Sequence, residues 1–532
     1  MTKQGRPVRS DRDAPGDAAI TDRRSATSLR SAGLVVVCFV AGAALMIVEL
    51  TGYRVLAPVF GNSLWTWTAL IGIILVAFSV GSYVGGRLGD RRPDPEVLAA
   101  MLAGAAILVV LIPRLMGLLA GYADGLGIIG GPLLLTAALF LLPGMLLGAV
   151  PPFAVRLHSL LASDRHVGGS AGLISMAGSL GSFVGTFGTG FVLLAQLGVT
   201  AILLGTGTVL FALAAATAIA SRRASARRLV SWVGVFVAAS AVGAAASKRT
   251  LPHGARLLYE KDGSYQRIEV AEYERRGRIA RMLLLDGRAE GGVLLAAKSL
   301  PLPYQNVYRL LSGAPGYEIK SALFIGAGAF GMPERVAETW PDARVDVVEV
   351  DPEVVRIGYS YFDLGAYPSV RSQVTDARVF IRTTRERYDL IFGDAYNGLR
   401  RIPAHLTSRE FFALVRARLQ PHGIFMMNVM AATRGDKAAL LSALAATLGA
   451  VFPHVRALPL SPDTPEQPQN IILVAGEDAL DRFLTPTAGG DDFVARLRAA
   501  AFDPRHSGPA PAVILTDDFN PVDAIVARQL WD

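Results

Sequence analysis

The chain has 532 residues, too many for one ordinary domain, so two or three domains are expected. Hydrophobic residues make up 52% of the chain and gather before residue 250, whereas charged residues gather after it, which indicates a membrane-type half followed by a soluble-type half. The net charge of +8 comes partly from Arg residues in short loops between apolar runs, and no basic stripe interleaved with aromatics occurs, so nucleic acid is not expected as a partner. The single cysteine, Cys38, excludes an intrachain disulfide and a cysteine-based metal site, and we expect no metal.

The first half predicts a multi-pass α-helical membrane domain over residues 32–246. Residues 1–31 are polar and rich in Arg and Asp, which favours a disordered tail. A span needs about 20 apolar residues, and seven runs approach this length: 32–53, 64–86, 97–120, 127–150, 170–195, 199–220 and 229–246. The seventh is short and rich in Ala and Gly, so six or seven spans in the cell inner membrane are expected. The fifth run carries small residues at three- and four-residue spacing, which predicts close packing against other helices.

The distribution of Arg and Lys gives conflicting information on orientation. These residues crowd the N-terminal tail and alternate loops, including 221–228, which places the N-terminus inside the cell. Seven spans would then place everything after residue 247 outside. A domain that uses a nucleotide made in the cytosol should lie inside. We therefore expect a cytoplasmic C-terminal domain, with the seventh run on the surface or re-entering.

The second half predicts two further domains. Residues 256–300 alternate apolar and polar residues around turn signals, which is typical of a small antiparallel β domain. Over residues 301–532, the strand-like runs "SALFIG", "RVDVVEV", "YDLIFGD" and "GIFMMNV" alternate with helical stretches. Such alternation predicts a parallel sheet covered by helices, an α/β Rossmann-like fold that binds ligands at the carboxyl ends of its strands.

A glycine-rich loop follows the first of these strands. Gly326, Gly328 and Gly331 form the pattern G-x-G-x-x-G at the start of a helix, where glycines allow a sharp turn and close approach to a ligand. Glu349 ends the next strand, where an acid can accept hydrogen bonds from ribose hydroxyls. The structural alternative is a tight turn with a surface carboxylate.

Two further acids end the third and fourth strands. Asp376 lies in "VTDAR" and Asp394 in "YDLIFGDAYNG", so four polar groups at successive strand ends are expected to meet at one edge of the sheet. Helix capping is the alternative for either aspartate taken alone. The glycine pattern does not separate NAD from an S-adenosyl nucleoside as ligand.

Several stretches after residue 256 resemble the spermidine synthase (polyamine aminopropyltransferase) family. They are "GSYQRIEV", "LLLDG", "GAGAFG", "VVEVDPEVV", "VTDARVF", "YDLIFGDAYNG", "HLTSREFFALVRARLQPHGIFMMNV" and "LTDDFNPVD", in the family's order. The whole chain resembles bacterial fused proteins in which a transporter-like membrane region precedes a spermidine-synthase-like domain. "APVFGNSLWTWTALIGIILVAFSVGSYVGGRLGDRRP" is similar to their membrane part.

This resemblance implies a fold of the S-adenosylmethionine-dependent methyltransferase type and an activity. The family transfers an aminopropyl group from decarboxylated S-adenosylmethionine to a small-molecule amine such as putrescine. By resemblance, Glu349 binds the ribose, Asp376 lies near the adenine and Asp394 is the base that deprotonates the amine. The same resemblance implies Gln266 as a nucleoside-binding residue and gives Asp286, Tyr304 and Asn397 as substrate residues.

The chain departs from the family pattern at positions that hold cationic groups. The glycine motif usually contains an Asp, but here the loop carries Ala329 and Phe330. Asn397 replaces the second acid of D-x-x-D, and Glu290 replaces a Gln after "LDG". A methyltransferase using ordinary S-adenosylmethionine is therefore one alternative, and a transporter or sensor with a non-catalytic nucleoside domain is another. The acceptor and the oligomeric state, a homo-oligomer included, stay open.

Overall fold

The computed structural model describes most of the chain, and the chain forms two compact units, which we describe separately. The described residues are 16–60, 64–123, 126–161, 167–221, 225–245, 254–263, 265–275, 277–296, 300–312, 314, 316–396, 402–478, 480–485, 491–507 and 512–531.

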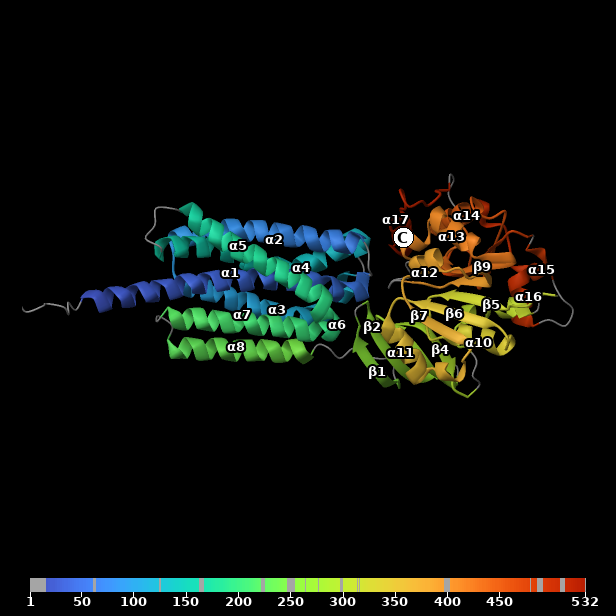
Figure 1. Cartoon of the computed structure of the whole chain (residues 1–532), viewed down its shortest axis with the longest axis horizontal. Coiled ribbons are helices and arrows are strands. Elements are labelled where there is room, and N and C mark those ends of the chain that lie inside the picture. Colours follow the sequence, from blue (N-terminus) through green and yellow to red (C-terminus); the bar gives the residue numbers. More distant parts are fainter. Residues whose placement is uncertain are drawn as a thin grey trace, which may run out of the picture. The chain divides into compact units, whose positions relative to one another are not determined.

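Long apolar helices form the first unit (Figure 1). Within the described residues, seven helices are long and apolar enough to cross a membrane. They belong to α1 (Gly16–Phe60), α2 (Leu64–Arg91), α3 (Pro95–Ala123), α4 (Gly127–Leu161), α5 (Val167–Gly188), α7 (Val199–Ala220) and α8 (Ala226–Ala245). A π-helical turn (Thr189–Leu193) and the short α6 (Leu194–Gln196) extend α5. The predicted membrane-type helical half is thus confirmed.

The N-terminal tail differs from the expectation of disorder over residues 1–31. Helix α1 begins at Gly16, so residues 16–31 are helical, and residues 1–15 lie outside the described residues. The segment contains Ala, Leu and Arg, which favour helix, and it continues a long apolar helix. Extending an existing helix adds one hydrogen bond for each residue and needs no new nucleation step. Polar composition alone therefore did not indicate that residues 16–31 are helical.

Small residues bring the helices into close contact. A Cβ atom added at Gly181 or Gly185 of α5 would overlap the backbone of Phe39 or Ala43 of α1. This agrees with the prediction that the small residues of the fifth run face other helices.

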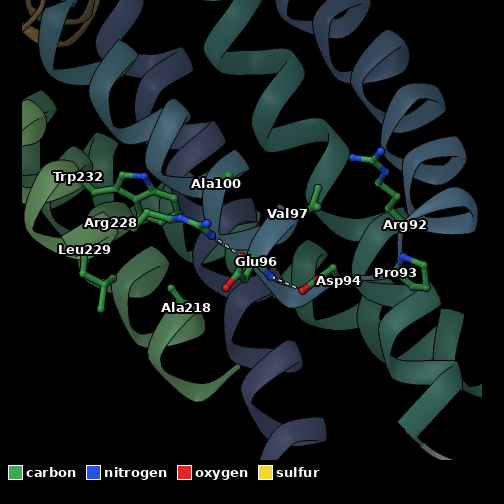
Figure 2. Close-up of a pocket in the computed structure, with 10 residues that line it drawn as sticks. All are labelled: Arg92, Pro93, Asp94, Glu96, Val97, Ala100, Ala218, Arg228, Leu229 and Trp232. Atoms are coloured by element: carbon green, nitrogen blue, oxygen red, sulfur yellow. Dashed lines mark hydrogen bonds and ion pairs between the residues drawn. The ribbon is translucent and has the colours of Figure 1, made fainter. Parts of the chain in front are cut away.

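The seventh helix, α8, also packs against the bundle. Only 17% of its apolar window is buried, against 56% for α3. Arg228 of α8 nevertheless pairs with Glu96 of α3, with 2.7 Å between Nη1 and Oε2 (Figure 2). Phe236 of α8 stacks on Phe211 of α7 with ring centroids 4.3 Å apart. The weakest predicted span is therefore a helix of spanning length that contacts two neighbours.

A four-stranded antiparallel sheet follows in the second unit. Its order is β1 (Arg256–Asp262), β2 (Arg267–Arg275), β3 (Arg278–Leu285) and β4 (Arg288–Leu294). Asp286 and Gly287 join β3 to β4 with positive φ angles of 50° and 79°. Two residues with positive φ make the tight turn that matches the twist of a hairpin.

The larger sheet has seven strands in the order β10-β11-β9-β8-β5-β6-β7. Strands β5 to β9 run parallel, and β10 and β11 add an antiparallel edge that was not predicted. From β5 the chain adds β6 and β7 on one side, and it then crosses over to add β8 and β9 on the other side of β5. The direction in which strands are added therefore reverses at β5, and ligands bind at the carboxyl ends of the strands beside such a point. Strand bounds are β5 (Ser321–Ile325), β6 (Arg344–Glu349), β7 (Val370–Val374), β8 (Tyr388–Gly393), β9 (Leu419–Ala431), β10 (His454–Pro459) and β11 (Gln469–Gly476).

Helices cover both faces of this sheet (Figure 1). One apolar core includes α10 (Gly331–Thr339) and α11 (Pro352–Tyr361). The other includes α12 (Ala377–Thr383), α13 (Arg409–Ala417), α14 (Ala439–Gly449) and α17 (Val522–Trp531). Shorter helices are η3 (Pro303–Asn306), α9 (Arg309–Ser312), η4 (Leu364–Ala366), η5 (Ala404–Leu406), η6 (Asp436–Ala438), α15 (Asp481–Leu484), α16 (Asp492–Ala499) and η7 (Pro504–His506). The predicted Rossmann-like fold is confirmed.

Candidate active site

The glycine loop passes directly over the end of a neighbouring strand. Gly326 follows β5 with a φ of +92°, and a Cβ atom there would lie 2.6 Å from the carbonyl oxygen of Asp394. Gly328 also has a positive φ, and Phe330 precedes α10 in the left-handed region. Only a residue without a side chain fits at Gly326, so this glycine permits the contact between the loop and the end of β8.

Glu349, at the end of β6, holds the glycine loop. Its Oε2 accepts a hydrogen bond from the backbone N–H of Ala327 at 3.0 Å, and its Oε1 accepts one from Asp351 at 2.9 Å. Burial raises the pKa of Glu349, although these two backbone donors oppose the rise. Each oxygen has a second lone pair, so the carboxylate can still accept hydrogen bonds from ribose hydroxyls.

Asp376 caps α12 and also contacts a histidine. Its Oδ1 accepts a hydrogen bond from Val379 N–H at 3.0 Å, and its Oδ2 lies 2.9 Å from His405 Nε2. Burial tends to raise the pKa of Asp376, but the bonds from Val379 and His405 outweigh it and lower the pKa. The capping alternative therefore describes part of its role, and His405 is a neighbour that the sequence did not indicate.

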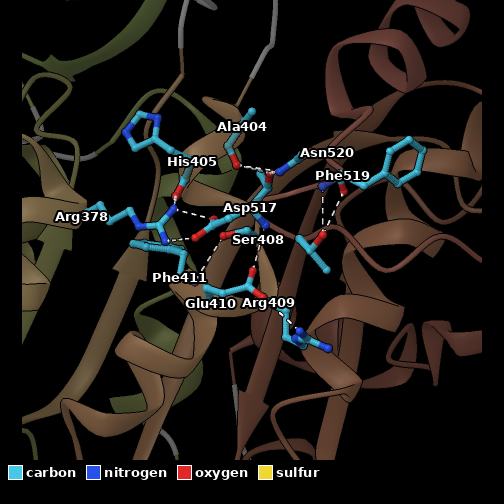
Figure 3. A network of polar contacts seen from close by, with 12 residues as sticks. Arg378, Ala404, His405, Ser408, Arg409, Glu410, Phe411, Asp517, Phe519 and Asn520 are labelled. Atoms are coloured by element: carbon cyan, nitrogen blue, oxygen red, sulfur yellow. Dashed lines mark hydrogen bonds and ion pairs between the residues drawn. The ribbon is translucent and has the colours of Figure 1, made fainter.

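The C-terminal segment fixes the position of His405 (Figure 3). Arg378 forms two hydrogen bonds with the Asp517 carboxylate and donates another to the carbonyl oxygen of His405 at 3.1 Å. Asn520 donates to the carbonyl oxygen of Ala404 at 2.8 Å. The stretch "LTDDFNPVD" thus ties η5, and His405 with it, to the start of α12.

Asp394 lies directly after β8 and is held by amide and hydroxyl groups. Asn428 of β9 donates from Nδ2 to Asp394 Oδ1 at 2.9 Å, and Asn470 of β11 donates to Asn428 Oδ1 at 3.0 Å. Tyr304 of η3 also hydrogen-bonds the Asp394 carboxylate. Burial, the largest cause, and the charge of Glu290 raise the pKa of Asp394 to about 7 despite the bonds from Asn428 and Tyr304.

These groups line a cavity of about 350 Å³. Its polar lining includes Arg288, Glu290, Tyr304, Asp394, Tyr396, Asn428 and Asn470. With Glu290, Asp394 and the Arg288 guanidinium in the lining, the cavity has a net negative charge once Asp394 has lost its proton. Since a carboxylate can bind an ammonium and can also take its proton, the cavity suits an amine.

Of the remaining residues predicted from the sequence, some line this cavity and others lie elsewhere. Tyr304 lines the cavity, whereas Asp286 and Gln266 are not among its described lining residues. Asp286 lies in the β3–β4 turn and accepts a hydrogen bond from Arg267 N–H at 3.0 Å. Gln266 follows the β1–β2 turn, where its carbonyl oxygen accepts from Gly263. Gly331 begins α10, and Asn397 lies outside the described residues.

Sequence reasoning missed Asn428 and Asn470. Each is a polar residue inside a strand that is otherwise apolar, "GIFMMNV" and "QNIILV". A buried amide needs partners, so such a residue in an apolar run signals a polar network. Strand pairing places the two amides together, because Ile472 of β11 lies opposite Asn428 of β9 and Asn470 lies two residues away.

The doubly wound sheet and the glycine loop at its edge define a Rossmann-like α/β domain that follows a bundle of membrane-type helices in the chain. No family model matches the chain. The Vibrio vulnificus polyamine aminopropyltransferase is 35% identical over 115 residues, covering 21% of this chain and 38% of that protein. The Corynebacterium efficiens polyamine aminopropyltransferase is 25% identical over 446 residues, covering 74% and 83%. The Streptomyces coelicolor polyamine aminopropyltransferase 2 is 26% identical over 404 residues, covering 72% and 71%. The chain is similar to proteins named polyamine aminopropyltransferase along most of its length.

Other similarities are narrower. A human eEF1A lysine and N-terminal methyltransferase is 26% identical over 142 residues, covering 25% of this chain and 20% of that protein. A probable spermidine synthase structure from Corynebacterium glutamicum is 20% identical with a TM-score of 0.37, covering 46% of this chain and 85% of that one. The chain spans only 38% of the Vibrio relative and 42% of the probable polyamine aminopropyl transferase of Bifidobacterium longum. Activity and substrates of this chain are therefore proposals.

Proposed function

We propose that this protein is a membrane-bound aminopropyltransferase. It moves the aminopropyl group of decarboxylated S-adenosylmethionine to a small polyamine-type acceptor. The observation that carries the proposal is the buried Asp394 carboxylate, which lies between the glycine loop and an anionic cavity with a pKa of about 7. Relatives named polyamine aminopropyltransferase along most of the chain support the same reading.

The glycine loop and the strand-end acids form the nucleoside site. Glu349 would bind the ribose hydroxyls while its backbone bonds keep the loop in place. Asp376 would lie at the adenine end, since it follows β7 at the same edge of the sheet, and His405 of η5 contacts its carboxylate there. The nucleoside supplies a carbon activated by the attached sulfonium.

Asp394 would act as the general base on the acceptor. An ammonium has no lone pair, so it must lose a proton before its nitrogen attacks the activated carbon. The proton passes to Asp394, the new N–C bond forms, and the S–C bond breaks with its electrons left on sulfur. Asn428 keeps Oδ1 of the carboxylate fixed, and Asp394 lines the cavity in which the amine would lie. A base with a pKa near 7 is well matched to this task at neutral pH.

The membrane-type helices would anchor the enzyme in the cell inner membrane. We place the catalytic domain in the cytoplasm, where S-adenosyl nucleosides are made. The Arg-rich stretch 221–228 runs into the first turn of α8 and fits a cytoplasmic position by the positive-inside rule. A surface or re-entrant α8, the least buried of the seven helices, reconciles this placement with the charge pattern.

A turnover assay tests the proposal. Purified full-length protein in detergent would be incubated with decarboxylated S-adenosylmethionine and a panel of diamines, including putrescine. Mass spectrometry should show an acceptor enlarged by one aminopropyl unit and one equivalent of 5′-methylthioadenosine. Asp394→Asn should slow the formation of both products by about 10²–10⁴-fold, while Glu274→Gln, at an exposed residue of β2, should not. Absence of product with every amine would contradict the proposal.

A methyltransferase is the second candidate. It is favoured by the similarity to the human methyltransferase and by the absence of an acid in the glycine loop, "GAGAFG". The same assay with ordinary S-adenosylmethionine separates the two, because methyl transfer releases S-adenosylhomocysteine and aminopropyl transfer releases methylthioadenosine.

A further inference from the structure

A cavity lies in the first unit where α3 and α8 begin and α7 ends (Figure 2). Its volume is about 500 Å³, within the range of roughly 300–1,000 Å³ that is common for small-molecule sites. The three helices are each long and apolar enough to cross a membrane. Because a spanning helix covers the hydrocarbon layer from end to end, a cavity at the helix ends would lie at the depth of the lipid headgroups.

The lining of this cavity carries charges of both signs. Arg92 and Arg228 supply two cations. Asp94 and Glu96 supply two anions, so the formal charges cancel. Arg228 donates to Glu96 Oε2 at 2.7 Å, whereas Glu96 Oε1 is buried and has no hydrogen-bond partner among the described residues. A buried carboxylate oxygen without a donor is costly, which indicates that a ligand supplies one.

The rest of the lining is apolar or amphipathic. Its apolar wall consists of Val97, Ala100, Ala218 and Leu229. Trp232, one turn beyond Arg228 on α8, also lines the cavity. Tryptophan favours the boundary between hydrocarbon and headgroups, because its ring is apolar and its N–H is polar. A matching ligand therefore combines a positive group, a negative group and an apolar part.

We propose that this cavity binds the headgroup of a phospholipid with a primary ammonium, of the phosphatidylethanolamine type. The ammonium donates to Glu96 Oε1, and the phosphate accepts hydrogen bonds from the guanidinium groups of Arg228 and Arg92. The acyl chains leave the cavity along its apolar wall. A choline headgroup has no N–H to donate, and a glycerol headgroup adds negative charge without an ammonium. Lipid binding here presupposes the membrane anchoring proposed above and is independent of the transferase activity.

Lipid binding to the full-length chain tests this inference. The protein, freed of lipid in detergent, would be titrated with short-chain phosphatidylethanolamine, phosphatidylcholine and phosphatidylglycerol, and with soluble glycerophosphoethanolamine. Native mass spectrometry would count the molecules bound to each chain. We expect one phosphatidylethanolamine bound about 10- to 100-fold more tightly than phosphatidylcholine, the value of one charged hydrogen bond. The soluble headgroup should bind more weakly than the lipid, because it buries no acyl chain.

Two variants separate the headgroup contact from the shape of the cavity. Glu96→Gln keeps the size of the side chain and an oxygen for Arg228 but removes the charge, so phosphatidylethanolamine should bind only as tightly as phosphatidylcholine. Ala100→Phe keeps every charge and fills the cavity from an exposed position, so it should abolish binding of this one lipid. The control is Asp90→Asn, which should leave binding unchanged. Its carboxylate is 75% exposed near the end of α2 and is not among the described lining residues.

Four outcomes would count against the lipid site. Equal wild-type affinity for the three lipids, or tighter binding of phosphatidylglycerol, overturns the proposed headgroup. Unchanged binding of phosphatidylethanolamine by both Glu96→Gln and Ala100→Phe places the lipid elsewhere. Glycerophosphoethanolamine bound as tightly as the lipid shows a site for a soluble zwitterion instead. These three results leave the transferase proposal untouched, whereas a chain that stays monodisperse without detergent refutes the membrane anchoring and the lipid site together.

Discussion

Replacing Asp394 by Asn should slow the enzyme while making the protein more stable at alkaline pH. The substitution keeps the size of the side chain and leaves an oxygen that can accept the hydrogen bond from Asn428. It removes a carboxylate that is buried against the charge of Glu290. Loss of a positioned general base typically costs about 10²–10⁴ in rate. Nucleoside affinity should change little, because the contacts of Glu349 with the loop are untouched.

The stability effect follows from the raised pKa of Asp394. Folding raises the pKa of this carboxyl from its ordinary 3.8 to about 7, so the folded protein favours the protonated form. The stabilisation from proton binding is fully present below pH 3.8 and is lost as pH rises through 7. The difference corresponds to about 4 kcal/mol at most. Asn carries no charge, so the variant avoids this cost at pH 8 and gains nothing at pH 4.

Two measurements test the pair of effects. Wild-type kcat/KM should rise with pH through about 7, as the base loses its proton. Thermal unfolding of the full chain should show Asp394→Asn more stable than wild type at pH 8 and equal to it near pH 4. Glu274→Gln is the control, because Glu274 is exposed. Asp389→Asn is unsuitable as a control, because the Asp389 carboxylate accepts a hydrogen bond from the backbone of Ser321 in β5. A variant with full activity on the true acceptor, or with lower stability at pH 8, would refute the reasoning.

Three further predictions concern the nucleoside site and the membrane topology. Glu349→Ala should weaken S-adenosyl nucleoside binding by about 1.5–3 kcal/mol in calorimetry, and tight NAD binding in its place would contradict the site assignment. Gly326→Ala should abolish nucleoside binding or folding, because its Cβ would lie 2.6 Å from the carbonyl oxygen of Asp394. The control is Gly277→Ala, where φ is +74° and no atom lies within 4 Å of the added Cβ. It should lower the free energy of unfolding by only about 1 kcal/mol. A reporter active only in the periplasm and fused after residue 250 should stay silent, and a strong signal would place the domain outside.

The sequence predicted the strands around the site because each of them is a short apolar run followed by a polar or glycine residue. β5 is buried along its whole length, and β6 and β8 are nearly so, which makes their limits readable. Parallel strands bring their carboxyl ends to one edge, so the glycine loop, Glu349 and the Asp394 backbone lie close together as the pattern implied. The contacts among the glycine loop, Glu349 and the Asp394 backbone depend on the parallel arrangement of the strands, which the alternation of apolar strands and helices in the sequence indicates.

The rest of the site depends on contacts that periodicity does not encode. Asn428 and Asn470 meet across two antiparallel strands whose pairing sets which side chains face each other. Tyr304 and Gln305 lie on a single 3-10 turn whose sequence, "PYQN", contains no pattern typical of a binding site. Asp286 illustrates the opposite error: it matched a family stretch, but the structure uses it in a tight hairpin turn.

The distribution of charge at the site indicates how the proposed cationic substrate would be held in a chain that lacks the family's acids. The glycine loop carries Ala329 and Phe330 where the family has an acid. Phe330 is fully buried in the apolar core, so its position serves packing in this chain. The negative charge comes instead from Glu290, on a β-strand that contacts the loop from outside the parallel sheet. Since two separate sheets supply Glu290 and Asp394, their spacing depends on how the small sheet packs against the glycine loop. A Cβ atom at position 291 would lie 2.8 Å from the backbone nitrogen of Ala329, so a larger residue there would force the small sheet and the glycine loop apart and move Glu290 relative to Asp394.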